Sequence, residues 1–295
     1  MPESFGVASE TAPLTRVLIK RPEAAFTDQA TLSANWQRLN YLNCPDFEQS
    51  RREMDAFSEL LTCLGSEVLE ADANPTVGPD SIYVHDSSIV TPSGVILASM
   101  GKEDRRTEPA AMRSTYEKLG VPVLGEISGS GRIEGGDLVW LDDGTVAIAE
   151  GYRSNAEGIR QFRALVGDGP KEVISVPLVH WNGPSDVLHL MSFISPIAPD
   201  LALVYSRLMP VIFRNRLLDM GIKLVEVPDE EYDSMGCNVL AVKPGVCVAL
   251  KGNPETKRRL EAAGCEVHLY DGSNISAPGC GGPTCLTRPV LRQRL

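Results

Sequence analysis

Residues 107–124 read TEPAAMRSTYEKLGVPVL, and this stretch contains the pattern from which the fold is predicted. Up to Leu119 the segment has the character of a helix, which stops at Gly120, and the short apolar run after the glycine reads as a strand. The next predicted element is a hairpin with its turn at Asp142-Asp143-Gly144. Helix, strand and hairpin together make one structural unit.

The same order of elements recurs along the chain. Helices are predicted at 50–64, 107–119, 154–165, 209–220 and 254–263, and the strands that follow them at 66–69, 121–124, 172–176, 222–227 and 266–270. Hairpins are predicted to pair 81–90 with 95–100, 137–141 with 145–149, 188–194 with 201–205, and 238–242 with 246–250. The repeat is about 45 to 55 residues long, the length range of propeller-type repeats.

The two ends of the chain are predicted to complete the fifth unit. Residues 285–290 could pair with the N-terminal strand at 15–20. No unit of this size buries its apolar face alone, so we predict a ring of five α/β units in a single domain over residues 1–295. A doubly wound sheet is the alternative, but it alternates single strands with helices and has no such hairpins.

The segment 23–43 is predicted to be a loop. It sets the aromatic residues Phe26, Trp36 and Tyr41 among polar ones. Long loops of this kind often close over a site as lids, and an ordinary surface loop with its own small cluster is the alternative.

Composition excludes several classes of function. The net charge is −11 and no Lys/Arg cluster occurs, which argues against nucleic acid as a partner. No apolar run is long enough to cross a bilayer, and residues 1–13 lack the pattern of a signal peptide, so we expect a cytoplasmic protein with no membrane partner. Seven cysteines, an odd number, do not indicate a disulfide framework. We expect a monomer or a homodimer.

A second informative stretch is CGGPTCLTRP, residues 280–289. The glycine pair between prolines and cysteines predicts a tight turn that exposes one sulfur, that of Cys285. The alternative is a buried, inert thiol, because unpaired cysteine is among the most buried residue types.

Polar residues also lie at the ends of other predicted hairpins, and in a ring equivalent ends converge on one mouth. Asp86 lies in DSIYVHD, residues 80–86, and Glu134 opens EGGD, residues 134–137. A carboxylate inside an apolar segment is costly unless it is paired, which favours functional roles for both acids over structural hydrogen bonding. His189 lies in DVLHL, residues 186–190, where a satisfied core histidine is the competing interpretation.

Metal ligation is the competing use of these residue types. Cys280 and Cys285 have no second Cys/His pair at the spacing of metal ligands. We therefore predict that the protein needs no metal and no organic cofactor.

These four motifs, in this chain order, resemble the pentein superfamily of guanidino-group-modifying enzymes, which includes dimethylarginine dimethylaminohydrolase, arginine deiminase and the amidinotransferases. The resemblance runs from Val17 to Pro289. It implies a five-bladed α/β propeller of ββαβ units, in agreement with the repeat pattern. Residues 80–86 and 153–158 (RSNAEG) are most similar to the dimethylarginine enzymes.

The resemblance also implies roles for individual residues. Cys285 would be the nucleophile and His189 the general acid/base, with Glu134 and Asp86 binding the guanidinium group. The substrate would be a small cationic guanidino compound. Arg153 and Arg105 would anchor the carboxylate of its amino-acid end, and Asp80 would face its α-amino group. Two further candidates, His85 and Asp137, would lie beside the ligand.

The implied activity is hydrolysis through a covalent thiouronium intermediate, which releases an amine or ammonia and leaves a ureido product such as citrulline. Two departures from the family pattern concern the substrate. Met191 stands where arginine deiminases and amidinotransferases have an aspartate, and His85 stands where dimethylarginine enzymes have a glutamate. An amidinotransferase, an arginine deiminase acting on free arginine, and a non-catalytic pentein protein remain as alternatives.

Overall fold

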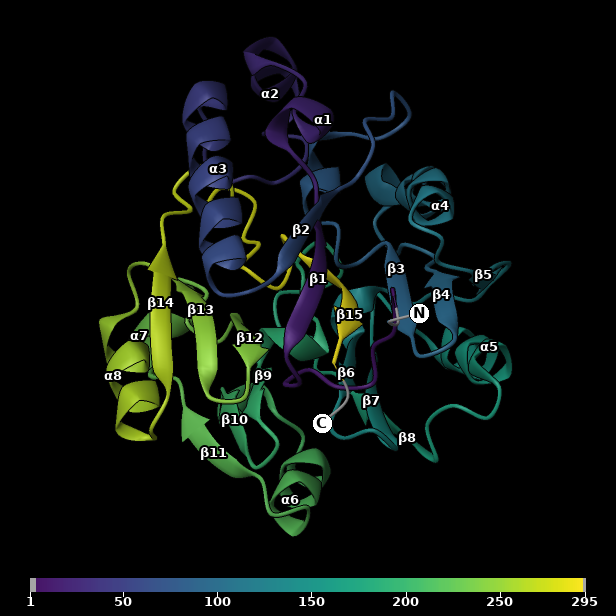
Figure 1. The fold of residues 1–295 in the computed structure, drawn as a ribbon, viewed down its shortest axis with the longest axis vertical. Coiled ribbons are helices and arrows are strands. Elements are labelled where there is room, and N and C mark those ends of the chain that lie inside the picture. The colour runs from purple at the N-terminus through teal and green to yellow at the C-terminus, as the bar shows by residue number, and fades with distance from the viewer. Residues whose placement is uncertain (1–3, 294–295) are drawn as a thin grey trace.

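Five three-stranded sheets form the framework of the protein in the computed structural model, which describes residues 4–293. In every sheet the first two strands are antiparallel and the third is parallel to the second. The sheets surround a common centre, with the main helices on the outside (Figure 1). This arrangement confirms the predicted five-bladed α/β pentein fold.

The strands follow the chain order of the repeat. They are β1 (Leu14–Ile19), β2 (Glu67–Glu70), β3 (Ser88–Thr91), β4 (Gly94–Leu97), β5 (Val123–Glu126), β6 (Leu138–Trp140), β7 (Thr145–Glu150), β8 (Glu172–Pro177), β9 (Ile194–Ala198), β10 (Leu201–Val204), β11 (Lys223–Glu226), β12 (Val239–Lys243), β13 (Val246–Leu250), β14 (Glu266–Tyr270) and β15 (Arg288–Arg292). Four sheets take three consecutive strands each, and the fifth has the order β15-β1-β2, so both ends of the described chain lie in one sheet.

One outer helix connects the second strand of each sheet to its third. These helices are α3 (Phe47–Cys63), α4 (Glu108–Lys118), α5 (Ala156–Val166), α6 (Val211–Asp219) and α8 (Pro254–Ala262); the shorter helices are α1 (Pro22–Ala25), α2 (Gln29–Asn35) and α7 (Asp229–Tyr232). Single-turn 3₁₀ segments occur at η1 (Pro79–Ile82), η2 (Glu103–Arg105), η3 (Gly135–Asp137), η4 (Leu190–Ser192) and η5 (Ser206–Leu208).

Local sequence explains where the outer helices begin and end. The side chain of Asp46 accepts a hydrogen bond from the backbone N–H of Gln49 and so caps α3, and Asn155 caps α5 in the same way through Gly158. The helix α4 ends before Gly120, whose φ of 68° lies in the left-handed region that only glycine adopts without strain. None of the helices within residues 4–293 is long and apolar enough to span a membrane.

Two expectations about local structure were wrong. The strands predicted to begin at residues 81 and 188 begin only at Ser88 and Ile194, because the residues before them form irregular segments and single 3₁₀ turns. The segment 23–43 is not a simple loop, since about half of it forms α1 and α2, and Phe26 and Tyr41 are buried in a core that also contains Phe57 of α3.

Candidate active site

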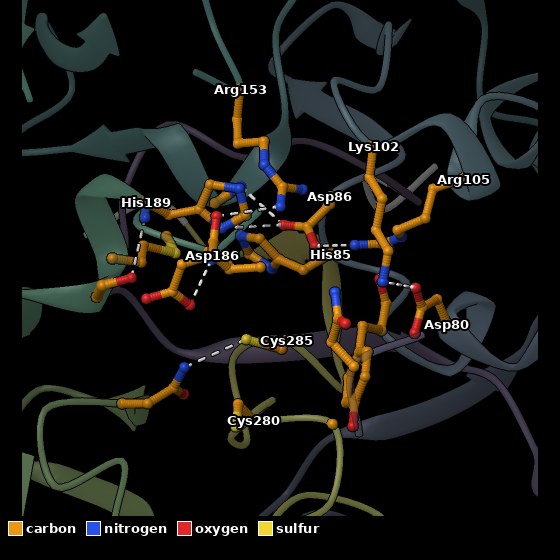
Figure 2. A pocket seen from close by; sticks show the side chains of 18 of the residues that line it. Asp80, His85, Asp86, Lys102, Arg105, Arg153, Asp186, His189, Cys280 and Cys285 are labelled. Atoms are coloured by element: carbon orange, nitrogen blue, oxygen red, sulfur yellow. Dashed lines mark hydrogen bonds and ion pairs between the residues drawn. The ribbon is translucent and has the colours of Figure 1, made fainter. Parts of the chain in front are cut away.

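The segments that lead into the first strand of each sheet meet at the centre of the ring and surround a cavity of about 160 Å³. They precede β3, β6, β9, β12 and β15, so every blade contributes to one site. Figure 2 shows the side chains that these segments and their neighbours direct into the cavity. The lining residues are Leu39, Asn40, Asp80, Tyr83, His85, Asp86, Lys102, Arg105, Gly136, Arg153, Ser185, Asp186, Val187, His189, Met191, Ser192, Asn238, Gly279, Cys280, Thr284 and Cys285.

Cys285 is held on a tight turn before β15. A Cβ atom at Gly281 would collide with the ring of Tyr83, so only glycine lets this backbone pass. The carbonyl oxygen of Cys285 accepts a hydrogen bond from the backbone N–H of His85 at 3.2 Å. Its sulfur accepts one from Nδ2 of Asn238 at 3.2 Å. The half-buried thiol therefore faces the cavity with one donor already directed at it.

The thiol is protonated at neutral pH in the free protein. Burial, together with the negative charge of Asp86, raises the pKa of Cys285 to about 11. The hydrogen bond from Asn238 acts in the opposite direction, because it stabilises the thiolate. Conversion to a nucleophile therefore requires either a positive charge in the cavity or a base.

His189 and Glu134 form the second part of the site. The Nε2 atom of His189 lies 2.7 Å from Oε2 of Glu134, whose carboxylate is completely buried. Burial alone would lower the pKa of His189, but the carboxylates of Asp137, Asp86 and Glu134 outweigh it and raise that pKa to about 9. The imidazole is therefore protonated at neutral pH and can donate a proton to a bound group.

Asp86 is fixed from two sides. Its Oδ2 atom accepts a 2.6 Å hydrogen bond from Nη1 of Arg105, and its Oδ1 atom accepts one from the backbone N–H of Gly136 at 3.1 Å. Burial would raise the pKa of this carboxyl, but the charges of His189 and Arg105 lower it, so Asp86 is ionised. A Cβ atom at Gly136 would lie 2.6 Å from Nδ1 of His189, so this close approach requires glycine.

Arg105 and Asp137 do not have the contacts expected from the sequence. The guanidinium group of Arg105 bonds Asp86, both carboxylate oxygens of Glu108 and the carbonyl oxygen of Tyr83, so it supports Asp86 rather than presenting a free anchor. Asp137 is fully buried and does not line the cavity.

The contacts of Asp137 explain this position. Its carboxylate accepts hydrogen bonds from the hydroxyl group of Ser154 at 2.6 Å and from the backbone N–H of Leu190 at 3.2 Å. Burial raises the pKa of Asp137 to about 6. The residue thus fixes the backbone next to His189 from behind the site.

His85 lines the cavity as a neutral residue. Burial, and then the charge of Arg288, lowers the pKa of His85 to about 3. Its Nδ1 atom donates to the carbonyl oxygen of Thr287 at 2.7 Å, which leaves Nε2 without a proton. This Nε2 atom is buried and has no hydrogen-bond partner among the residues that the structure describes. His85 therefore offers a hydrogen-bond acceptor and no charge.

The remaining charged residues of the cavity are Asp80, Lys102, Arg153 and Asp186. Nζ of Lys102 bonds Oδ2 of Asp80 at 2.6 Å. Arg153 donates to the carbonyl oxygen of Asp186 at 3.2 Å, and its Nη1 atom lies 3.6 Å from Oε1 of Glu134. Figure 2 shows Arg153 close to the His189 side of the site, and Lys102 with Asp80 on the other side.

Asp86, Glu134 and His189 are also the residues that could hold a metal ion, since one ligand atom from each lies within 4.8 Å of the others. Asp86 is already paired with Arg105, and Glu134 is paired with Arg153 and with the protonated imidazole of His189. A divalent ion would have to compete with these cations. A guanidinium ion fits the acids better, because it is planar and donates hydrogen bonds to both.

The structure reveals three participants that the sequence analysis missed, namely Asn238, Lys102 and Glu108. Asn238 directly precedes β12, in the segment of the fourth blade that corresponds to those carrying His189 before β9 and Cys285 before β15. Applying the repeat to the fourth blade would have identified it. Lys102 and Glu108 carry no such signal.

Comparison with known proteins gives consistent matches. A family model described as N,N dimethylarginine dimethylhydrolase, eukaryotic, matches residues 21–292. The N(G),N(G)-dimethylarginine dimethylaminohydrolase of Streptomyces coelicolor is 26% identical over 278 residues, which are 93% of this chain and 96% of that protein. The arginine deiminase of Rhodococcus erythropolis is 28% identical over 261 residues, 74% of this chain, but the match spans only 61% of the deiminase.

Solved structures agree on the fold. A mutant dimethylarginine dimethylaminohydrolase from Pseudomonas aeruginosa, complexed with citrulline, has a TM-score of 0.74 at 21% sequence identity. The similarity covers 93% of this chain and 98% of that one.

Proposed function

Because the chain belongs to the dimethylarginine dimethylaminohydrolase family of the pentein superfamily, we propose that it hydrolyses an arginine-like guanidino compound. The reaction releases an amine or ammonia and leaves a ureido product. The observation that carries this proposal is a cavity lined by the Cys285 thiol, by the ionised Asp86 and by His189, whose imidazole pairs with the buried Glu134 behind it. Cysteine is the only strong nucleophile among these groups.

Binding orients the substrate. Asp86 and Glu134 accept hydrogen bonds from the guanidinium nitrogens, and this holds the central carbon against the sulfur of Cys285. His85 lies beside the same group as a neutral acceptor. A third acid that would bind a guanidinium nitrogen is absent at Met191, which lines the cavity and leaves space for an alkylated nitrogen.

The substrate also activates the nucleophile. In the free protein both protons stay in place, since the pKa of Cys285 is about 11 and that of His189 about 9. A bound guanidinium partly neutralises Asp86, whose charge opposes ionisation of the thiol, and itself favours the thiolate. The thiol releases its proton to solvent as the substrate binds, and Asn238 stabilises the resulting thiolate through its amide N–H.

The reaction proceeds in two halves. The thiolate of Cys285 attacks the guanidinium carbon, and the protonated His189 transfers its proton to the departing nitrogen, so that the C–N bond breaks and the amine leaves. The product of this half is a thiouronium bonded to Cys285. The neutral His189 then takes a proton from water, which attacks the same carbon. The C–S bond breaks to give the thiolate, and the remaining O–H proton passes to solvent to leave the ureido product.

Two residues are proposed to bind the remote end of the substrate. Arg153 retains guanidinium donors besides those used for Asp186 and Glu134, and it is the carboxylate anchor. Asp80 faces the far part of the cavity. Arg105 and Asp137 are positioning residues, because they contact Asp86 and the backbone next to His189 respectively.

The test is a mass-spectrometric screen for ureido products. It uses arginine, its N-methyl and N-hydroxy forms, agmatine and guanidino acids, with Cys285→Ser as the inactive variant and Cys63→Ser as the control. Cys63 is exposed and lies on α3. We expect Cys285→Ser to lose at least about a thousandfold in kcat with its fold intact, as for other removed nucleophiles. Unchanged turnover in Cys285→Ser would refute the proposal, and turnover that depends on an added amine would identify an amidinotransferase.

A further inference from the structure

We propose that Lys102 occupies the position of a substrate α-ammonium group, so that the preferred substrate is an ω-guanidino carboxylate without an α-amino group. This inference rests on the proposed function, because it names the substrate class for the same cavity. It starts from an ion pair that the proposed chemistry does not use. That pair joins Lys102 to Asp80 inside the cavity.

The geometry shows that Asp80 already has a cationic partner. Its carboxylate is buried, with 7% of the side chain exposed, and Nζ of Lys102 lies 2.6 Å from its Oδ2 atom. A second hydrogen bond, to the carbonyl oxygen of Leu39 at 3.0 Å, holds the same ammonium in place. Both residues line the cavity, on the side away from His189 (Figure 2).

An incoming α-ammonium would have to displace Lys102 from Asp80 or share the carboxylate with it. The displaced lysine would lose a charge-assisted hydrogen bond, and it would remain beside another cation because its side chain is only 20% exposed. Two ammonium groups that share one buried carboxylate also repel each other. Recognition of an α-amino acid at this position is therefore unfavourable.

A carboxylate at the same end of the substrate meets a favourable partner. Lys102 uses two of its three N–H donors for Asp80 and Leu39, so one donor remains for an anion. The charged residues that line the cavity, apart from His189, are three acids (Asp80, Asp86, Asp186) and three bases (Lys102, Arg105, Arg153). A guanidino carboxylate is a zwitterion without net charge, so it matches this balance, whereas an α-amino acid adds one cation.

The experiment compares two compounds that differ only in the α-ammonium group, 5-guanidinopentanoate and L-arginine. We expect the wild-type protein to prefer 5-guanidinopentanoate at least about tenfold in kcat/KM, the lower limit for breaking one charge-assisted hydrogen bond. In Lys102→Met, which keeps most of the length of the side chain and removes its charge, the preference falls at least about tenfold. Lys118→Met is the matched control, because it breaks the exposed Lys118–Asp72 pair on α4 outside the cavity and leaves the preference unchanged.

Two outcomes overturn the inference and leave the proposed function standing. One is a wild-type protein that turns over L-arginine or its N-methyl forms at least as well as 5-guanidinopentanoate. The other is a preference that Lys102→Met does not alter in a folded variant. Calorimetric binding of both compounds to Cys285→Ser measures recognition without turnover. Tighter binding of 5-guanidinopentanoate than of L-arginine supports the inference. Failure of the wild-type protein to hydrolyse any guanidine would refute the proposed function but would not affect this binding result.

Discussion

The hydrogen bond from Asn238 to Cys285 leads to a specific prediction about the reactivity of the thiol. Asn238→Ala removes the amide N–H that lies 3.2 Å from the sulfur. This donor stabilises the thiolate more than the thiol, so its loss raises the pKa of Cys285 above the value of about 11 in the wild-type protein. The thiolate fraction at a given pH falls accordingly.

The size of the effect follows from the energy of one hydrogen bond to a charged group, about 1.5–3 kcal/mol. The lower end applies to a sulfur acceptor, and about 1.4 kcal/mol corresponds to a factor of ten in the ionisation equilibrium. We therefore expect the thiolate fraction, and with it the rate of alkylation at Cys285 below pH 10, to fall about tenfold in Asn238→Ala.

The assay is alkylation by iodoacetamide between pH 7 and 10, followed for each cysteine by peptide mass spectrometry. Exposed Cys63 gives an internal standard, and its rate stays the same in all variants. The amide oxygen of Asn238 also accepts two hydrogen bonds from Thr284. Asn238→Asp removes the N–H donor to Cys285 but keeps an oxygen that accepts both bonds from Thr284. The added negative charge makes Cys285 of this variant react no faster than in Asn238→Ala.

The outcome that refutes this reasoning is equally clear. If Asn238→Asp alkylates at the wild-type rate and only Asn238→Ala is slow, Asn238 acts by holding the Thr284 turn. If both variants react like the wild type, the amide has no influence on the thiol at all.

Further predictions concern the groups around His189. Because the pKa of His189 is raised from 6.5 to about 9 in the folded protein, its protonation adds stability that is complete below pH 6.5 and is lost as the pH rises through 9. The free energy of unfolding, measured by denaturant titration, should fall over this window by about 3 kcal/mol, and by less in Glu134→Gln. Gly136→Ala pushes a methyl group against Nδ1 of His189 and should lower kcat at least about tenfold with a small change in Tm; wild-type kcat would contradict the close packing. Glu108→Gln weakens the hold on Arg105 and should raise KM for guanidino substrates several-fold, which steady-state kinetics would show; an unaltered KM would mean that Arg105 needs no such support.

Much of the fold could be predicted from the sequence because its signals are local. The helix predicted at 107–119 is observed as α4. Its apolar face and the glycine that ends it could be recognised because these signals lie in residues close together in the sequence. The strand predicted at 81–90 was wrong over most of its length. Residues 79–91 are buried throughout, and an apolar run does not distinguish a strand from an irregular buried segment that carries site residues.

In the candidate site too, features with a local sequence signal could be predicted and contacts between distant segments could not. Positions such as Cys285 and His189 could be chosen from short motifs at the ends of predicted hairpins, and the structure brings both to one cavity. Contacts between blades could not be foreseen. The repeat marks the position of Asn238, but nothing local indicates that its amide contacts Cys285, or that Arg105 pairs with Glu108 and Asp86 rather than remaining free for a substrate.

The account depends most on covalent catalysis by Cys285. The direct measurement is acid quenching during turnover of a substrate from the guanidine screen, followed by mass spectrometry of the intact protein and its peptides. We predict a transient adduct on the peptide that contains Cys285, with the mass of the substrate less its departing amine, and its absence from Cys285→Ser. Turnover with the adduct on another residue, or with no adduct on Cys285 at any quench time, would contradict the account.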